Sequence, residues 1–287
     1  MGRKISLGKA LRKIASESTT DDRTSVVPDI DKACAGGITE SRYLSRRDIK
    51  TSAKHLIALM DDFDRGEFYP AFYKFYSAVM SPSARAKGVF HPSQLMTQCK
   101  RFMCYDLLGT PPSDKSVSRG ISGALQRTFD VGTWYHVYIQ NILYQIGLLE
   151  QAEVPVNNPD RFISGSADGM FKTEVFGEPV VLEIKTMNDL FYKRAVFRPF
   201  KKHEFQASIY ARELGAEKVL YLYINKNTSE MKDFLLPIDE AQLADADKIM
   251  DQVITAVKAK EILPRECTDK FCENALICPF ASLCFKE

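Results

Sequence analysis

The sequence predicts an α/β fold, in which strands and helices alternate along the chain. Short runs rich in Val, Ile, Leu and Phe predict strands near residues 151–157, 161–172, 179–186 and 218–224. Apolar residues that recur every three or four positions predict helices over 130–149, 201–214 and 239–260. Alternation of this kind is typical of a sheet that is covered by helices.

Composition indicates the class of protein. The 287 residues are 45% hydrophobic and 26% charged, which is ordinary for a soluble globular protein with one substantial domain and an appendage. The net charge is only +2, so nucleic-acid binding would depend on local basic patches. The sequence has no long apolar stretch and no recognisable secretory leader, so we expect no membrane partner and a cytoplasmic location.

Four regions are expected along the chain. They are a polar, loosely packed N-terminal segment (1–50), a helical region that contains Cys99 (51–118), the α/β core (119–260) and a cysteine-rich tail (261–287). In the helical region, the spacing of the apolar residues predicts helices over 49–80.

The strand near 179–186 carries the first chemical signal. Side chains alternate along a strand, so Glu183 and Lys185 share one face while Leu182 and Ile184 share the other. Glu and Lys are rarely buried unless they are paired or bind a metal. The pattern predicts a catalytic or metal-binding pair, and the alternative is a simple ion pair on an edge strand.

A second carboxylate belongs to the preceding strand. Asp168, followed by Gly169, ends or bends that strand and would bring its side chain to the face that carries Glu183. Carboxylate oxygens suit Mg²⁺ or Mn²⁺. Two carboxylates beside a lysine suit phosphodiester hydrolysis, in which the metal neutralises the phosphate and activates a water. The alternative is that Asp168 and Gly169 only turn a hairpin.

Two helices add further polar side chains. His136 lies on the 130–149 helix, one turn from Gln140, while Gln206 and Tyr210 are four apart on the 201–214 helix and share a face. Such groups can hydrogen-bond a catalytic side chain or a DNA strand. The alternatives are an ordinary core or surface histidine and the polar edge of an amphipathic helix.

The order of these motifs resembles the RecB-type branch of the PD-(D/E)XK nucleases. This branch includes RecB and AddB nuclease domains, λ-type exonucleases and CRISPR-associated spacer-acquisition nucleases, and the resemblance covers roughly residues 90–287. It implies a restriction-endonuclease-like core with a central mixed sheet flanked by helices. Ala167 precedes Asp168, where the wider family has Pro, and this branch commonly uses Gly-x2-Asp instead. The motifs are Gly132-x3-His136, Gly165-x2-Asp168-Gly169, Glu183-x-Lys185 and Gln206-x3-Tyr210.

The resemblance also implies a role for each site residue. Metal ligands would be the side chains of His136, Asp168 and Glu183 with the carbonyl of Ile184, and Lys185 would be the catalytic lysine. Gln206 and Tyr210 would support the active site and the bound strand.

Cysteines give the second signal. The chain has seven, and four of them lie in the last 21 residues, at positions 267, 272, 278 and 284. In a reducing compartment, clustered cysteines bind metal more often than they form disulfides. Thiolates at such spacing suit zinc or an iron–sulfur cluster.

A subset of the RecB-type branch holds a 4Fe–4S cluster with one Cys before the nuclease core and three after it. The segment from Phe90 to Arg101 resembles the N-terminal element of that subset, and Cys278-Pro-Phe-x3-Cys284 resembles its C-terminal end. The resemblance implies ligation by Cys99, Cys278 and Cys284, and by either Cys267 or Cys272. We expect Cys104 to be a buried apolar residue and Cys34 to have no role, and a four-Cys zinc site in the tail is the alternative.

A basic run precedes the Gln206 helix. Basic groups with interleaved aromatics are typical of single-strand binding. The alternative is a solvated loop with both phenylalanines in the core. The basic residues are Lys193, Arg194, Arg198, Lys201 and Lys202, and the aromatics are Phe197 and Phe200.

The combined signals predict a metal-dependent DNA nuclease. The resemblance favours an exonuclease acting on single-stranded or end-containing DNA in recombination, repair or spacer processing, in a bacterium or a phage-infected host cell. The short, cysteine-tailed chain without a helicase region resembles phage-encoded stand-alone or CRISPR-associated nucleases. The resemblance implies a recombination or helicase protein as a partner. The sequence does not determine the direction of digestion, or whether the protein cuts as an exonuclease or as an endonuclease. The alternatives are a non-catalytic DNA-binding scaffold subunit with the same fold and a zinc-tailed interaction protein.

Overall fold

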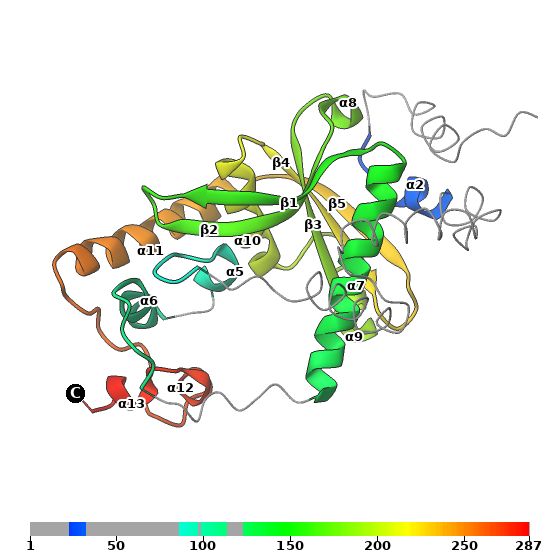
Figure 1. The fold of residues 1–287 in the computed structure, drawn as a ribbon. Coiled ribbons are helices and arrows are strands. Elements are labelled where there is room, and N and C mark those ends of the chain that lie inside the picture. The colour runs from blue at the N-terminus through cyan, green and yellow to red at the C-terminus, as the bar shows by residue number, and fades with distance from the viewer. Residues whose placement is uncertain (1–22, 33–85, 97–98, 114–122, 287) are drawn as a thin grey trace, which may run out of the picture.

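A computed structural model describes residues 23–32, 86–96, 99–113 and 123–286 (Figure 1). Its centre is a five-stranded mixed sheet in the order β1-β2-β3-β4-β5. The pairs are antiparallel except for β3 and β4, which run parallel. The expected α/β architecture, a central mixed sheet flanked by helices, is therefore confirmed. The strands are β1 (Leu149–Asn158), β2 (Ile163–Phe171), β3 (Val180–Met187), β4 (Lys218–Asn225) and β5 (Met231–Pro237).

Helices cover both faces of the sheet. One face packs against α10 (Lys201–Glu213) and α5 (Pro92–Leu95). Helix α11 (Glu240–Lys258) packs on α10, and α6 (Lys100–Leu107) packs on α11, and all four helices share one hydrophobic core with this face. The other face packs against α7 (Gly123–Gln145) and α2 (Val27–Lys32) in a second core. Each core excludes water from one side of the sheet, so polar groups on the central strands lie in a dry environment.

The parallel pairing of β3 and β4 requires a crossover connection, which α9 (Asp189–Arg194) and α10 provide. Helix α10 ends as predicted, because Gly215 adopts a φ of 71° just beyond Leu214. The predicted alternation along β3 is also confirmed: Val181 faces the α10 core, whereas Leu182 and Ile184 face the α7 core.

Three features differ from the sequence-based expectations. Residues 23–32 are not loosely packed, since Val26 and Ile30 are fully buried and Asp233 accepts hydrogen bonds from the backbone at Val26 and Val27. Helix α7 begins earlier than predicted and ends before residue 149, because Gly147 adopts a φ of 84° and Leu149 starts β1.

Strand β5 was not predicted. It is a half-buried edge strand, and Lys232 and Asp233 interrupt its apolar pattern, so only its pairing with β4 identifies it. The predicted helices over 49–80 and Cys34, for which no role is expected, fall outside the described residues. Within the described ranges, no helix has the length and apolar character needed to cross a membrane.

Candidate functional site

The candidate site lies at a fork between β2 and β3. The two strands pair only at Gly169 with Leu182 and at Met170 with Val181. Asp168 and Glu183 are the next residues on the two strands. Both carboxylates therefore lie where the strands separate.

Asp168 is held by contacts from both sides of the fork. Its Oδ1 lies 3.2 Å from Nδ1 of His136 on α7, and its Oδ2 accepts a 2.5 Å hydrogen bond from the N–H of Ile184. Burial opposes ionisation, but the charge and hydrogen bond of His136, together with Lys185 and the Ile184 N–H, hold the pKa of Asp168 below its usual range. Burial also opposes protonation of His136, but Asp168 outweighs it and raises the pKa of the imidazole. Asp168 is thus a carboxylate at neutral pH.

Glu183 and Lys185 form an ion pair on the same face of β3, in which the carboxylate is buried and the ammonium is partly exposed. Only 1% of the Glu183 side chain is exposed, and its Oε1 lies 2.5 Å from Nζ of Lys185. Burial raises the pKa of Glu183 to about 7, with Asp168 adding to this effect and Lys185 opposing it. Burial opposes the charge on Lys185, but Glu183 and Asp168 prevail and raise its pKa. Gln206 on α10 accepts a long contact of 3.5 Å from Nζ of Lys185.

Tyr210 packs directly on β2. A β-carbon at Gly165 would lie 2.7 Å from the Tyr210 hydroxyl and 2.8 Å from its ring, so any other residue there would force Tyr210 to move. At Gly132 on α7, a β-carbon would lie 3.1 Å from Oγ1 of Thr186. Both glycines of the predicted motifs therefore allow a helix to approach the sheet closely beside the carboxylates.

The donors fit a hard divalent cation in kind, although they are not gathered around one point. Among residues 23–32, 86–96, 99–113 and 123–286, no three His, Cys, Asp or Glu side chains converge in a group that could hold a metal ion. Asp168 and Glu183 contact His136, Ile184 and Lys185 instead. The buried Oε1 of Glu183 accepts no hydrogen bond of good geometry from the described residues, and its neighbour is the Lys185 ammonium at 2.5 Å. The predicted ligand set of His136, Asp168, Glu183 and the Ile184 carbonyl stays a prediction.

Sequence reasoning left some polar neighbours of the site unassigned. Gln140 on α7 and Glu153 on β1 adjoin Asp168, and His203 on α10 contacts Tyr223 on β4. The position of Gln140, one turn from His136, was the only available signal. Glu153 gave none, because its place opposite Asp168 depends on how two strands pair.

The tail cysteines approach Cys99. A small cavity is lined by Cys99, Cys267, Cys278 and Cys284, together with aromatic side chains of α6 and the tail. Cys272 does not line this cavity, and it shares a hydrogen bond with Cys267. Burial, that bond and the neighbouring thiols raise the pKa of Cys267 to about 12, and burial raises the pKa of Cys99. Cys104 is fully buried within α6, as expected.

The basic run is less uniform than its sequence suggests. Lys193 pairs with Asp189 at 2.7 Å, and the Arg194 guanidinium lies over the ring of Phe191. Lys201 and Lys202 are exposed on α10. The two phenylalanines differ, since Phe200 stacks on Tyr223 whereas Phe197 is 91% exposed. The alternative of two core phenylalanines is therefore wrong for Phe197.

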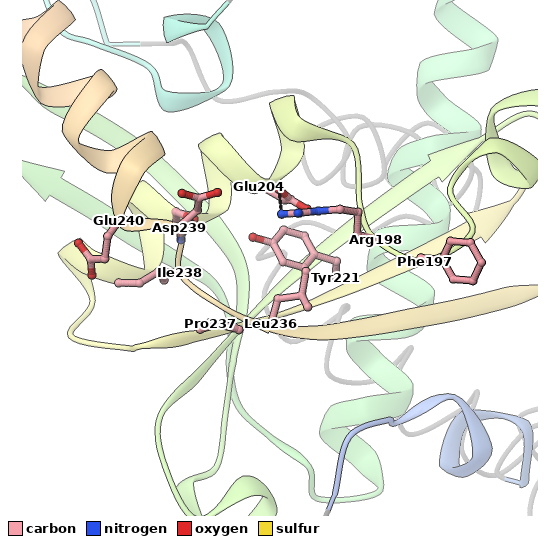
Figure 2. Close-up of a pocket in the computed structure, with 10 residues that line it drawn as sticks. Phe197, Arg198, Glu204, Tyr221, Leu236, Pro237, Ile238, Asp239 and Glu240 are labelled. Carbon is pink, nitrogen blue, oxygen red and sulfur yellow. Dashed lines mark hydrogen bonds and ion pairs between the residues drawn. The ribbon is translucent and has the colours of Figure 1, made fainter.

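Arg198 is already engaged. Its guanidinium donates two hydrogen bonds, of 2.9 and 2.8 Å, to the buried carboxylate of Glu204. Figure 2 shows this pair above the ring of Tyr221, with Phe197 turned away from it, at a cavity of about 580 Å³. The pair attaches the loop before α10 to the helix, so any DNA contact by Arg198 would involve its remaining donors.

Comparisons with known proteins complete the description. No protein-family model matches the chain, and no curated protein matches it. Among solved structures, SSO0001 is 18% identical with a TM-score of 0.42, covering 74% of this chain and 96% of that one. The alkaline exonuclease LHK-Exo of Laribacter hongkongensis is 14% identical with a TM-score of 0.46, covering 66% and 93%. The complex of LHK-Exo with dAMP is 15% identical with a TM-score of 0.45, and it again covers 66% of this chain and 93% of that one.

Proposed function

We propose that this protein is a metal-dependent deoxyribonuclease of the RecB-like PD-(D/E)XK type, and that it acts as an exonuclease on single-stranded or end-containing DNA. One observation carries the proposal. At the fork between β2 and β3, two carboxylates and a lysine meet: Asp168 contacts His136 and the Ile184 N–H, Glu183 pairs with Lys185, and Gln206 approaches Lys185 from α10. Burying charges is costly, and a protein that only binds DNA has no need of two carboxylates and a lysine at one site, whereas phosphodiester hydrolysis uses all three.

In this proposal Asp168 and Glu183 would hold Mg²⁺ or Mn²⁺, with His136 and the Ile184 carbonyl as further ligands. When bound, the ion would supply positive charge at the scissile phosphate and lower the pKa of a water. Lys185 is charged because two carboxylates raise its pKa, so its ammonium can donate a hydrogen bond to the attacking water. Gln206 restrains the ammonium from α10, and Tyr210 keeps that helix against β2.

The decisive experiment compares the wild type with Lys185→Ala on end-labelled single- and double-stranded DNA, with Mg²⁺, with Mn²⁺ and with a chelator. We expect metal-dependent degradation that falls by about a hundredfold or more in the variant, as is typical when a group that stabilises developing charge is removed. Lys258→Ala is the matched control, because Lys258 is an exposed lysine in the last turn of α11. The product ladder gives the polarity of digestion.

Degradation that Lys185→Ala leaves intact would contradict the assigned role of the lysine. If neither protein cleaves DNA with either metal, the nuclease proposal is wrong, and the result favours the alternative of a non-catalytic DNA-binding scaffold subunit. Binding of labelled single strands by Lys201→Glu and Lys202→Glu variants tests the basic run separately, because phosphate contacts weaken binding of all sequences alike.

We also propose that the cysteines hold a 4Fe–4S cluster that fastens the tail to α6. Cys99, Cys267, Cys278 and Cys284 around one cavity support this arrangement, and they favour Cys267 over Cys272 as a ligand. Thiolates of this number suit iron–sulfur or zinc. Anaerobic purification followed by iron, sulfide and zinc analysis separates the two metals. We expect iron and sulfide to be lost in Cys278→Ser and kept in Cys272→Ser, and stoichiometric zinc in a colourless protein would contradict the cluster.

A further inference from the structure

Glu153 occupies an unusual backbone position on β1. Its φ is 50°, in the left-handed region that residues other than glycine rarely adopt and that is unfavourable within a strand. The register pairs Ala152 with Gly169 and Val154 with Ala167, so Glu153 lies opposite Asp168, and the ladder of paired residues skips this position. Strain of this kind persists where the surrounding structure requires it, and such sites are often functional.

The side chain of Glu153 connects β1 to α7 and β2. Its Oε1 accepts a 2.7 Å hydrogen bond from Nε2 of Gln140, and its Oε2 accepts a 3.2 Å bond from the hydroxyl of Ser166. The same Nε2 donates a 2.8 Å bond to the backbone carbonyl of Asp168. Both partners of this amide nitrogen are acceptors, so they fix its orientation, and Gln140 is only 6% exposed.

We propose that Glu153 is a positioning residue for the metal-binding carboxylate, an inference that rests on the proposed function. The Gln140 amide holds α7 against the backbone of Asp168, and His136 lies one turn away on that helix, with its ring on the carboxylate of the same residue. Glu153 holds the Gln140 amide in one orientation, and that amide in turn holds α7 and β2 together at Asp168. The left-handed backbone at Glu153 directs its carboxylate to that amide.

Three substitutions separate positioning from folding. Glu153→Gln keeps an acceptor for Gln140 and should behave like the wild type to within about threefold. Glu153→Ala removes the acceptor, and Glu153→Gly removes it while also relieving the backbone, because glycine adopts a positive φ freely. We expect Mn²⁺ affinity, measured by calorimetry without DNA, to fall tenfold or more in both, as is typical when an outer partner of a metal ligand is lost.

Cleavage and stability complete the test. In Glu153→Ala and Glu153→Gly we expect kcat to fall with Mn²⁺ affinity while KM for DNA stays constant, and Glu153→Gly to resist urea at least as well as Glu153→Ala. Wild-type Mn²⁺ affinity in both variants, or losses that follow the free energy of unfolding across all three, would overturn the proposal. If the wild type binds Mn²⁺ without cleaving DNA, the proposed nuclease activity is wrong. The positioning role of Glu153 is then tested by the Mn²⁺ affinities of the wild type and the three variants alone. A wild type that binds no Mn²⁺ would refute both.

Discussion

At Gly165 the absence of a side chain allows Tyr210 to reach β2. The tyrosine is 4% exposed, and its hydroxyl and ring occupy the space that a β-carbon would need. The Gly165-x2-Asp168 motif therefore has a steric cause: the glycine lets α10 approach the strand three residues before the carboxylate. The conformation of Gly165 is not the reason, since its φ is not positive.

We predict that Gly165→Ala destabilises the protein by about 1–3 kcal/mol, the usual consequence of forcing extra volume into a packed core. The measurement is the free energy of unfolding in urea. In a Tyr210→Leu background, which removes the clashing atoms, the penalty for Gly165→Ala should shrink to below about 0.5 kcal/mol. An equal penalty in both backgrounds would show that Tyr210 is not the obstacle.

Helix α10 is the element that joins the site to the rest of the sheet. Gln206 and Tyr210 face the fork, while Glu204 binds Arg198 and His203 contacts β4. The Tyr223 hydroxyl accepts a hydrogen bond from the Phe200 N–H and lies 2.5 Å from Nδ1 of His203. A neutral imidazole can accept the hydroxyl proton at Nδ1, and this arrangement fixes the first turn of α10.

That neutral histidine predicts a dependence of stability on pH. Burial, with Lys185 and Lys202 nearby, lowers the pKa of His203 to about 3, whereas an unfolded histidine titrates near 6.5. Below pH 6.5 the unfolded chain therefore binds a proton that the folded chain does not, and stability falls as pH falls towards 3. Between pH 7 and pH 5 this should remove about 2 kcal/mol.

Urea unfolding of the wild type and His203→Gln at both pH values measures the effect. We expect the wild type to lose about 2 kcal/mol more than the variant between pH 7 and pH 5, because all other groups titrate in both proteins. The same loss in both would mean that His203 is protonated in the folded state.

At the scale of the whole molecule, the tail folds back on the region before the core. The short helices α12 (Glu273–Ile277) and α13 (Ala281–Cys284) lie beside α6 (Figure 1). Phe280, 3% exposed, packs between Phe102 and Tyr105 with ring centroids 5.3 and 5.2 Å away. This aromatic contact joins segments more than 170 residues apart and brings the tail cysteines to Cys99.

We predict that Phe280→Ala releases the tail. Truncating a buried phenylalanine typically costs about 3–5 kcal/mol, so the tail should open roughly a hundred to several thousand times more often. Trypsin cleavage at Arg265 or Lys270, followed by mass spectrometry, reports the opening. Phe271→Ala is the control, because Phe271 lies in the same tail but is 71% exposed. Equal cleavage of the two variants would show that Phe280 does not dock the tail.

Sequence by itself determined the features that follow from local periodicity and turn chemistry. The shared face of Glu183 and Lys185 follows from the two-residue period of a strand, and the end of α10 at Gly215 follows from its left-handed conformation. Both depend on residues that are neighbours along the chain, so they could be predicted without knowing the fold.

Tertiary structure alone decided how distant segments meet. The burial of α2, the ion pair of Arg198 with Glu204, and the position of Cys267 in the lining of the Cys99 cavity could not be read from spacing. The position of Glu153 opposite Asp168 is the clearest case. A shift of one residue in the register of β1 and β2 would turn that carboxylate to the other face, and long-range packing, not local sequence, selects the register.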